Sequence, residues 1–566
     1  MSIRGIKENI CRMGLKDELK TGIRLTRKNI IMMIFSICLS IVGVLTISLF
    51  RSSLSKNVIH GLNAKIITLG HFALLVLLII VFYGLLHMVD RLVYKSSIYK
   101  TGEADGKQKI FIKVFIINLA CWGVWFWLYF PGAGMNDTIN CIMSFHDDIQ
   151  PLAYQLIIYY GIHFLTNLTN NMTISFAILV VMQMMLMSMI VAQLVCWLYK
   201  KRIKSLYINI IIIYYAFLPA VADYSITLVK DTLFSVCIVA VIPLVYELVE
   251  QYGEAITNKK FYFSFLASLL GISIIRSNGK YIATIIILLL LITKMNNKKY
   301  ILSLLIILLV INTSLSACEK NLKSNNVNFR EAIGVPLAQV GAVLVTDGYI
   351  SETDRETLNY LLPLDVWREG YSYSFADSIK FNGNFNNQWL NENKGKFLST
   401  WFSILENNFG TYVKAYLCHT YGFWNISPLN ITSIDYSQSY FRRINNNTGD
   451  DSYWGEFCKE NNLENCEISF GSVREQMDAI FQVEFRINLI LGAGIMLWLC
   501  VWCIIELFVY KKYRVCLVFM PILLNWATLM VAAPASFIYR YSFYLILSLP
   551  LLIMITLMQI NNKINK

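Results

Sequence analysis

Charged residues are scarce in this sequence. Only 15% of its 566 residues are Asp, Glu, Lys or Arg, against about 25% in soluble domains. Hydrophobic residues make up 56% of the chain, and the mean hydropathy is +0.53. Apolar runs long enough to cross a bilayer recur along it. The composition excludes a soluble globular protein and predicts an all-α polytopic membrane protein.

No cleavable signal peptide is expected either. The first 28 residues are basic, and the apolar run that follows them is too long for the hydrophobic region of a signal peptide.

The apolar runs predict about twelve transmembrane helices. They lie near residues 29–50, 66–89, 110–130, 172–199, 205–221, 226–249, 261–275, 281–293, 300–317, 486–510, 515–533 and 542–560. The short pair at 261–293 predicts two helices joined by a tight bend at "RSNGK".

The distribution of Lys and Arg predicts the topology. If the N-terminus is cytoplasmic, the segments on that side hold more than half of the 49 Lys and Arg residues, and the short outer loops hold far fewer. Because positively charged loops stay in the cytoplasm, this alternation predicts a multi-pass cell-membrane protein with both termini cytoplasmic. The net charge of +13 is then a topology signal, and no nucleic-acid partner is expected.

Two longer segments fall on the outer side in this topology. Residues 131–171 form a polar loop followed by "LAYQLIIYYGIHFL", whose pattern predicts a helix lying in the membrane interface. Residues 318–485 are numerous enough for a folded, mainly helical domain, in which "SETDRETLNYLL" opens with a Ser-x-x-Asp capping pattern. The expected organisation is a basic N-terminus (1–28), a transmembrane module (29–317), this extracytoplasmic domain and C-terminal helices (486–566).

Cysteine is mostly found inside the apolar runs, where it behaves as a small hydrophobe. The outer domain contains Cys318, Cys418, Cys458 and Cys466. A disulfide between Cys458 and Cys466 is compatible with a location outside the cytoplasm. Unpaired thiols are an equal alternative.

The first outer loop has carboxylates but no Lys or Arg. Asp137 lies about seven residues beyond the third span, where it could accept a proton from an incoming hydroxyl. It could also bind a divalent cation, Mg²⁺ or Mn²⁺, together with Asp147, Asp148 or His146. The alternative is a solvated loop carboxylate, and adjacent residues such as the His-Asp-Asp triplet rarely converge on one ion.

Isolated cations occur at the outer ends of several spans. Lys230 and Asp231 in "TLVKDTLF" begin an apolar span, where charges are costly and are functional or paired. They could pair with each other, or Lys230 could bind an anionic lipid headgroup. Arg276 flanks a Ser-Asn-Gly turn, and its guanidinium matches phosphate geometry, although interfacial snorkelling is the alternative. Arg540 stands between two tyrosines, as in an ordinary aromatic belt.

Together these stretches resemble a known class of enzymes. A Pro-Gly-x-x-x-x-Asp stretch, "QPLAYQLII", "LVKDTLF", "RSNG" and a late "RY" resemble bacterial multi-pass membrane proteins of the GT-C glycosyltransferase type, closest to a Firmicutes branch. The outer-domain stretches "IGVPLAQVGAV" and "YSFADSIK" also fit, and the similarity covers most of residues 110–560. The resemblance implies a GT-C-like fold, a sugar donor on polyprenyl phosphate, and inverting transfer to an acceptor in the cell envelope, which could be a glycan, lipid or protein.

The resemblance also implies roles for individual residues. Asp137 matches the catalytic acidic position. The candidates for the lipid phosphate are Lys230, Arg276 and Arg540. Many relatives have His-Pro where this chain has Gln150 and Pro151, so Gln150 could hydrogen-bond the donor but not carry charge, and His146 is a possible substitute.

Other classes remain open. Twelve spans with both ends inside is a common layout of transporters and lipid flippases, but few carriers need a large outer domain, and no paired broken helices occur in matching halves. Polysaccharide polymerases and ligases usually rely on Arg-rich outer loops, and the acidic first loop argues against them. A non-catalytic structural relative is the third alternative.

Overall fold

The computed structural model describes residues 27–53, 69–95, 98–99, 106–143, 145, 150–322, 329–373, 375–426, 492–532 and 539–561. These residues are overwhelmingly helical, with one sheet of two short parallel strands, β1 (Ala133–Gly134) and β2 (Thr227–Leu228). The predicted all-α class is confirmed.

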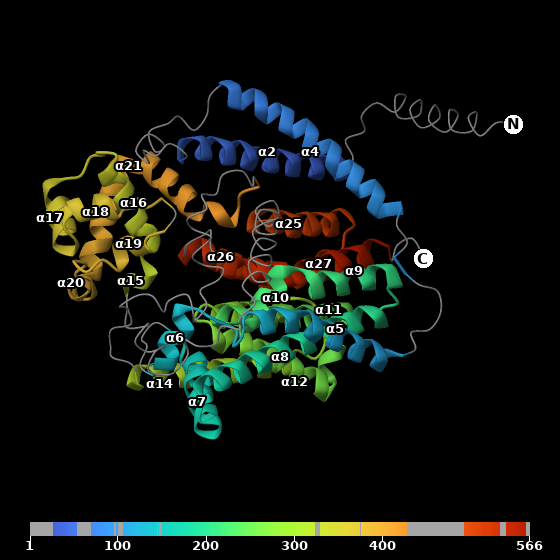
Figure 1. Cartoon of the computed structure of the whole chain (residues 1–566). Helices are drawn as coiled ribbons and strands as arrows, with labels where there is room; N and C mark the ends of the chain where they lie inside the picture. Colours follow the sequence, from blue (N-terminus) through green and yellow to red (C-terminus); the bar gives the residue numbers. More distant parts are fainter. Residues whose placement is uncertain are drawn as a thin grey trace, which may run out of the picture.

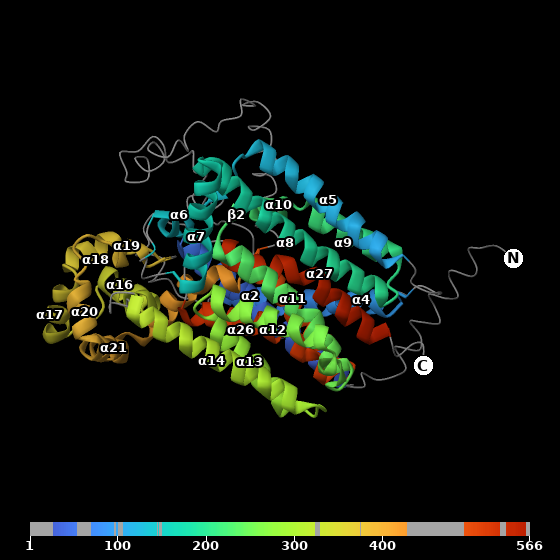
Figure 2. The ribbon, with the colours of Figure 1, turned by 90° about the horizontal axis from the view of Figure 1, so that it is seen from below.

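Eight helices of the described residues are long and apolar enough to cross a membrane. They are α2 (Arg27–Ser53), α4 (Leu69–Lys95), α5 (Lys107–Leu128), α8 (Met172–Lys200), α11 (Lys230–Glu250), α14 (Lys298–Leu322), η4 (Tyr513–Phe519) continued by α26 (Met520–Ala532), and η5 (Tyr539–Ser542) continued by α27 (Phe543–Asn561). They form a bundle of elongated helices (Figures 1 and 2). The chain is therefore a polytopic helical membrane protein.

A bent pair would make a ninth span. It consists of α9 (Ser205–Phe217) and α10 (Pro219–Ile226), whose axes differ by 51°. Pro219 is the first residue of α10, where proline fits the first turn but could not continue the preceding helix. The bend therefore follows from the sequence.

Three more helices of the bundle are shorter, namely α12 (Lys259–Ile275), α13 (Gly279–Ile292) and α25 (Ala493–Val509). The predicted tight pair is confirmed, since α12 and α13 pack on each other across the turn at 276–278. Gly279 makes this turn possible, because a Cβ atom there would lie 1.7 Å from the carbonyl oxygen of Ile272.

The segment predicted as the first outer loop, residues 131–171, contains two helices, α6 (Asn136–Met143) and α7 (Leu152–Thr169). The helix predicted over "LAYQLIIYYGIHFL" is therefore present, its place in the membrane interface stays a prediction, and Figure 1 shows α7 running across the direction of the bundle helices. Both views place α6 and α7 at the end of the bundle that also carries α15–α20 (Figures 1 and 2). We call this end the domain end.

The separate domain has its own hydrophobic core, which includes Leu337, Leu358, Trp367 and Phe397. Its helices are α15 (Phe329–Ala332), α16 (Gly334–Val345), α17 (Glu352–Leu361), α18 (Leu364–Gly370), α19 (Asp377–Lys380), α20 (Asn387–Glu392) and the first part of α21 (Lys394–Thr420). The capping prediction is confirmed, since the hydroxyl of Ser351 accepts the backbone N–H of Asp354 at 3.2 Å.

Some described residues within 318–485 do not belong to the separate domain. Helix α14 continues to residue 322, and η2 (Tyr421–Phe423) packs into the bundle, where Trp526 donates a hydrogen bond to the Phe423 carbonyl at 3.1 Å. Cys318 is an exposed free thiol and Cys418 a buried one. Cys458 and Cys466, and the disulfide predicted between them, lie outside the described residues.

Candidate functional site

The parallel strands β1 and β2 bring Asp137 and Lys230 together. Ala133 pairs with Thr227 and Gly134 with Leu228. Because the strands are parallel, the chain leaves both in the same direction, and α6 and α11 begin side by side. The N-terminal turns of these helices then carry Asp137 and Lys230.

Hydrogen bonds secure this junction. Thr138 donates from its hydroxyl to the carbonyl of Leu228 and lies 2.9 Å from the hydroxyl of Tyr154 on α7. Gln183 of α8 donates to the carbonyl of Thr227 at 2.8 Å. All three side chains are buried, and their hydrogen bonds connect α6, α7, α8 and β2 next to the site.

Asp137 contacts two cations. Lys230 donates to Oδ2 of Asp137 at 2.9 Å, and Nη1 of Arg540 lies 3.3 Å from the same oxygen. The ammonium of Lys230 also donates to the side-chain oxygen of Gln150. Residues 93 and 403 positions apart in sequence from Asp137 thus meet at its carboxylate.

A second carboxylate, Asp231, lies behind the first. Its Oδ1 is 3.4 Å from Nη1 of Arg276, and its Oδ2 is 3.8 Å from Nε of Arg540. Only 2% of its side chain is exposed. From the sequence, a mutual ion pair with Lys230 was the only interaction expected for Asp231, and the structure instead gives each of the two charges other partners. Neighbouring residues of a helix do not face each other, so the two charges point to different partners.

Aromatic rings hold the guanidinium groups. Arg276 lies over the rings of Tyr541 and Phe234, at 5.3 and 5.5 Å from their centroids. Arg540 lies 4.7 Å from the centroid of Tyr541 and donates to its hydroxyl at 2.6 Å. Tyr541, which was not among the predicted site residues, therefore contacts both arginines. The aromatic belt around Arg540 was the only signal for it.

The charges of this cluster do not cancel. Lys230, Arg276 and Arg540 provide three positive charges, and Asp137 and Asp231 provide two negative ones. Burial by itself raises the pKa of Asp137, but the charges of Lys230 and Arg540 outweigh it and hold this pKa well below its usual range. The carboxylate is therefore ionised at neutral pH, and the cluster carries one excess positive charge.

The remaining predicted site residues are not placed. His146, Asp147 and Asp148 lie outside the described residues. Among the residues that are described, no group of three or more His, Cys, Asp or Glu side chains could hold a metal ion. The Mg²⁺ or Mn²⁺ site expected in this loop stays a prediction.

The structure thus brings Asp137 together with Lys230, Gln150 and Arg540. Arg276, the fourth predicted binding residue that the structure describes, joins them through Asp231. Chemically, the cluster can bind an anion through guanidinium and ammonium groups beside a carboxylate that accepts hydrogen bonds. Asp137 keeps 20% of its side-chain surface exposed, against 2% for Asp231.

Comparison with known protein families gives a match over most of the chain. Residues 150–566 match a family of unknown function, DUF6020. No curated protein and no solved structure matches the chain. The matched part includes Gln150, Lys230, Arg276 and Arg540, whereas Asp137 precedes it.

Proposed function

The chain belongs to the DUF6020 family, whose function is unknown, and we propose that it is a membrane glycosyltransferase. It would move a sugar from a polyprenyl-phosphate donor to an acceptor of the cell envelope, with inversion of configuration at the anomeric carbon. The observation that carries this proposal is the contact of Asp137 with both Lys230 and Arg540. One cluster then contains a carboxylate that would accept the proton of the acceptor hydroxyl and cations that would bind the donor phosphate.

The proposed fold is GT-C-like with about twelve spans. The nine long or bent spans, together with α12, α13 and α25, give this number. Helix α13 has 14 residues, which corresponds to about 21 Å of helix, less than the hydrocarbon thickness of about 30 Å. It would therefore cross only a thinned or partly protein-covered region. The helices α6 and α7, inserted between α5 and α8, support the GT-C assignment because they carry the acidic residue at the bundle end.

The domain end is proposed to face away from the cytoplasm. The opposite ends of the spans carry basic clusters, such as residues 200–204 and 294–299, and such clusters stay in the cytoplasm. The acceptor would then bind between the cluster and the separate domain, and the lipid tail would lie among the bundle helices.

The reaction is a displacement at the sugar carbon. The acceptor oxygen forms a bond to this carbon while the bond from the carbon to the phosphate oxygen breaks. The proton of the acceptor hydroxyl passes to Asp137, and the electron pair of the broken bond stays on the polyprenyl phosphate. Arg276 and Arg540 stabilise the charge that builds up on the leaving phosphate.

The low pKa of Asp137 has a consequence for this mechanism. A carboxylate held by two cations is a weak base, because efficient bases have pKa values near the working pH. A donor phosphate would compete with Asp137 for Lys230 and Arg540. Donor binding would thereby raise the pKa of Asp137, and we propose that the donor binds before the acceptor.

The test is glycan analysis of a strain that lacks the gene and is complemented with variants. The wild type should restore a sugar substituent of the envelope, and Asp137→Asn should not, although it inserts in the membrane. The matched control is Asp365→Asn, an exposed carboxylate of the separate domain, which should restore the sugar fully.

Other results would select another function. Shorter polymer chains with intact substituents would indicate a polymerase, and accumulation of lipid-linked precursor in the cytoplasmic leaflet would indicate a flippase. Full restoration of the sugar by Asp137→Asn would remove the catalytic assignment.

A further inference from the structure

A pair of asparagines connects the turn after Arg276 to α26. Asn278 follows Arg276 by two residues, in the turn that joins α12 to α13. Its side-chain amide donates to Oδ1 of Asn525 at 3.2 Å and to the hydroxyl of Thr528 at 2.7 Å, both on α26. Asn525 is fully buried and belongs to the span formed by η4 and α26. The turn that carries Arg276 is thus tied to a helix of the bundle.

Stability does not explain an amide at position 525. Oδ1 of Asn278 and Nδ2 of Asn525 are buried, and neither has a hydrogen-bond partner in the part of the chain that the structure describes. A buried polar pair that is only half satisfied is less favourable than an apolar contact of the same shape. Leucine in place of Asn525 would remove the unpartnered nitrogen and bury more apolar surface. Polar residues inside spans are costly and are usually functional.

Arg276 depends on this turn for its orientation. Its ion pair with Asp231 at 3.4 Å includes no hydrogen bond, because neither oxygen of Asp231 accepts one from a described residue. The rings of Phe234 and Tyr541 contact the guanidinium, but a contact with a ring face restrains the distance more than the direction of the N–H groups. The direction of these N–H groups is therefore set by the backbone of the turn, which the side chain of Asn278 holds to α26.

From these contacts we propose that Asn525 is a positioning residue for the phosphate contact of Arg276. Asn525 accepts the hydrogen bond of Asn278 and thereby holds the turn, so that the guanidinium is oriented before an anion binds. A side chain that is already oriented loses less conformational entropy on binding, which strengthens the complex. This role rests on the function proposed above, in which Arg276 binds the phosphate of a prenyl carrier.

Binding of farnesyl phosphate to the purified full-length protein tests this role. Asn525→Leu should raise the Kd about fivefold, which corresponds to the loss of one hydrogen bond, without lowering the melting temperature. Thr528→Val, which removes the other acceptor of Asn278, should have a similar effect on the Kd. In an Arg276→Gln background, Asn525→Leu should change the Kd no further, because it acts through Arg276. The Kd for farnesol, which has the same chain without the phosphate, should be equal in the wild type and in Asn525→Leu.

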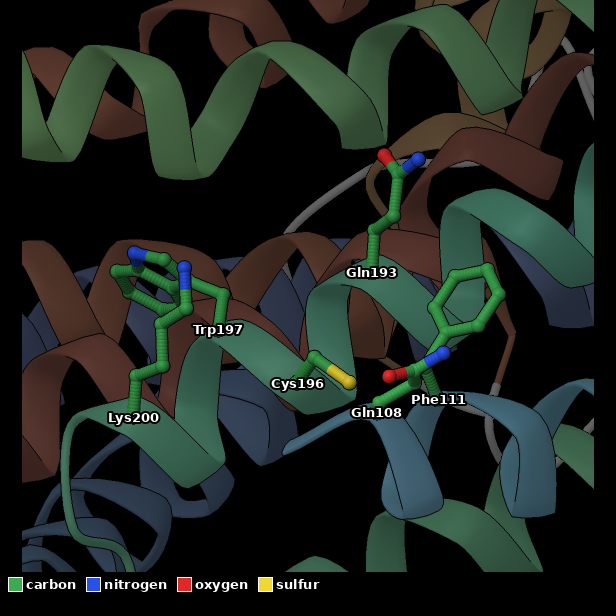
Figure 3. A pocket seen from close by; sticks show the side chains of 6 residues that line it. All are labelled: Gln108, Phe111, Gln193, Cys196, Trp197 and Lys200. Carbon is green, nitrogen blue, oxygen red and sulfur yellow. The ribbon is translucent and has the colours of Figure 1, made fainter. Parts of the chain in front are cut away.

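Figure 3 shows a cavity at which the probe could bind instead. It has a volume of about 380 Å³, lies between the start of α5 and the end of α8, and is lined by Gln108, Phe111, Gln193, Cys196, Trp197 and Lys200. The matched control is Gln193→Leu, which exchanges an amide for leucine in this lining. It should leave the Kd for farnesyl phosphate unchanged, and an equal loss in this variant would overturn the role of Asn525.

Other results would overturn it as well. They are an unchanged Kd in both Asn525→Leu and Thr528→Val, an effect of Asn525→Leu that persists in the Arg276→Gln background, an equal rise of the Kd for farnesol, and no binding of farnesyl phosphate by the wild type. The proposed transfer reaction would fail differently. A wild type that binds farnesyl phosphate as expected but restores no sugar to the envelope would refute the glycosyltransferase and leave the role of Asn525 intact.

Discussion

Replacing Asp137 with Asn tests the charge cluster most directly, because the two side chains have nearly the same shape. Two cations lie 2.9 and 3.3 Å from the lost charge. At an effective dielectric constant of about 20, each such contact has a Coulomb energy of about 5–6 kcal/mol. Desolvation and repulsion between the cations offset much of it. Breaking a buried pair costs about 3–5 kcal/mol. Since 20% of the Asp137 side chain is exposed, we expect Asp137→Asn to lower the free energy of unfolding by about 2–3 kcal/mol.

The assay is thermal unfolding of the purified wild type, Asp137→Asn, Lys230→Met and the double variant in one detergent. Because the two side chains are in contact, the double variant should lose less stability than the sum of the single ones, by about 1–2 kcal/mol. Asp365→Asn serves as the control and should stay within about 0.5 kcal/mol of the wild type. Additive effects of Asp137→Asn and Lys230→Met would refute the direct contact.

Three further predictions concern the same region. Folding lowers the pKa of Asp137. Its contribution to the free energy of unfolding should therefore be constant from pH 8 to 5 and shrink only below the unfolded pKa of about 3.9. A stability difference between the wild type and Asp137→Asn that already falls between pH 7 and 5 would contradict this. Asp231→Asn should cost about 3 kcal/mol, because it leaves two arginines without their buried partner; a melting temperature equal to that of the wild type would show that Asp231 does not hold them. Gly279→Ala should destabilise the protein by at least about 2 kcal/mol through the clash with a backbone oxygen, whereas Gly383→Ala, where a Cβ meets nothing within 4 Å, should be neutral in the same unfolding assay.

Much of the fold could be predicted from the sequence because hydrophobic length is a local property. The predicted apolar runs that lie within the described residues are mainly helical, and the tight turn before Gly279 was visible in "RSNGK". The capping of α17 by Ser351 was equally local. The extent of the separate domain was not predictable in this way. Residues 421–423 lie outside every apolar run of membrane-spanning length, but their backbone carbonyl and rings pack on α25 and α26.

The site was predictable only as a set of residues on one side of the membrane. Asp137, Lys230, Arg276 and Arg540 were selected because charges are costly next to apolar spans. Their pairing depends on contacts between segments that are far apart in sequence, and no local pattern specifies those. Asp231 was missed as a separate member because its neighbour Lys230 offered a simpler partner. The direction in which side chains leave a helix was the signal that could have separated them.

The pairing pattern also explains why the cluster can hold its shape without being neutral. Each carboxylate contacts cations from other segments, so α6, α11, the end of α12 and η5 are all tied to one another. Arg540 contacts both carboxylates and therefore links the contacts of Asp137 to those of Asp231. An anion that draws Arg540 away from Asp137 leaves Asp231 to hold the guanidinium in place. The buried Asp231 thus anchors the arginines, whereas Asp137, with 20% of its side chain exposed, is the carboxylate that would exchange its partners for the proposed substrate.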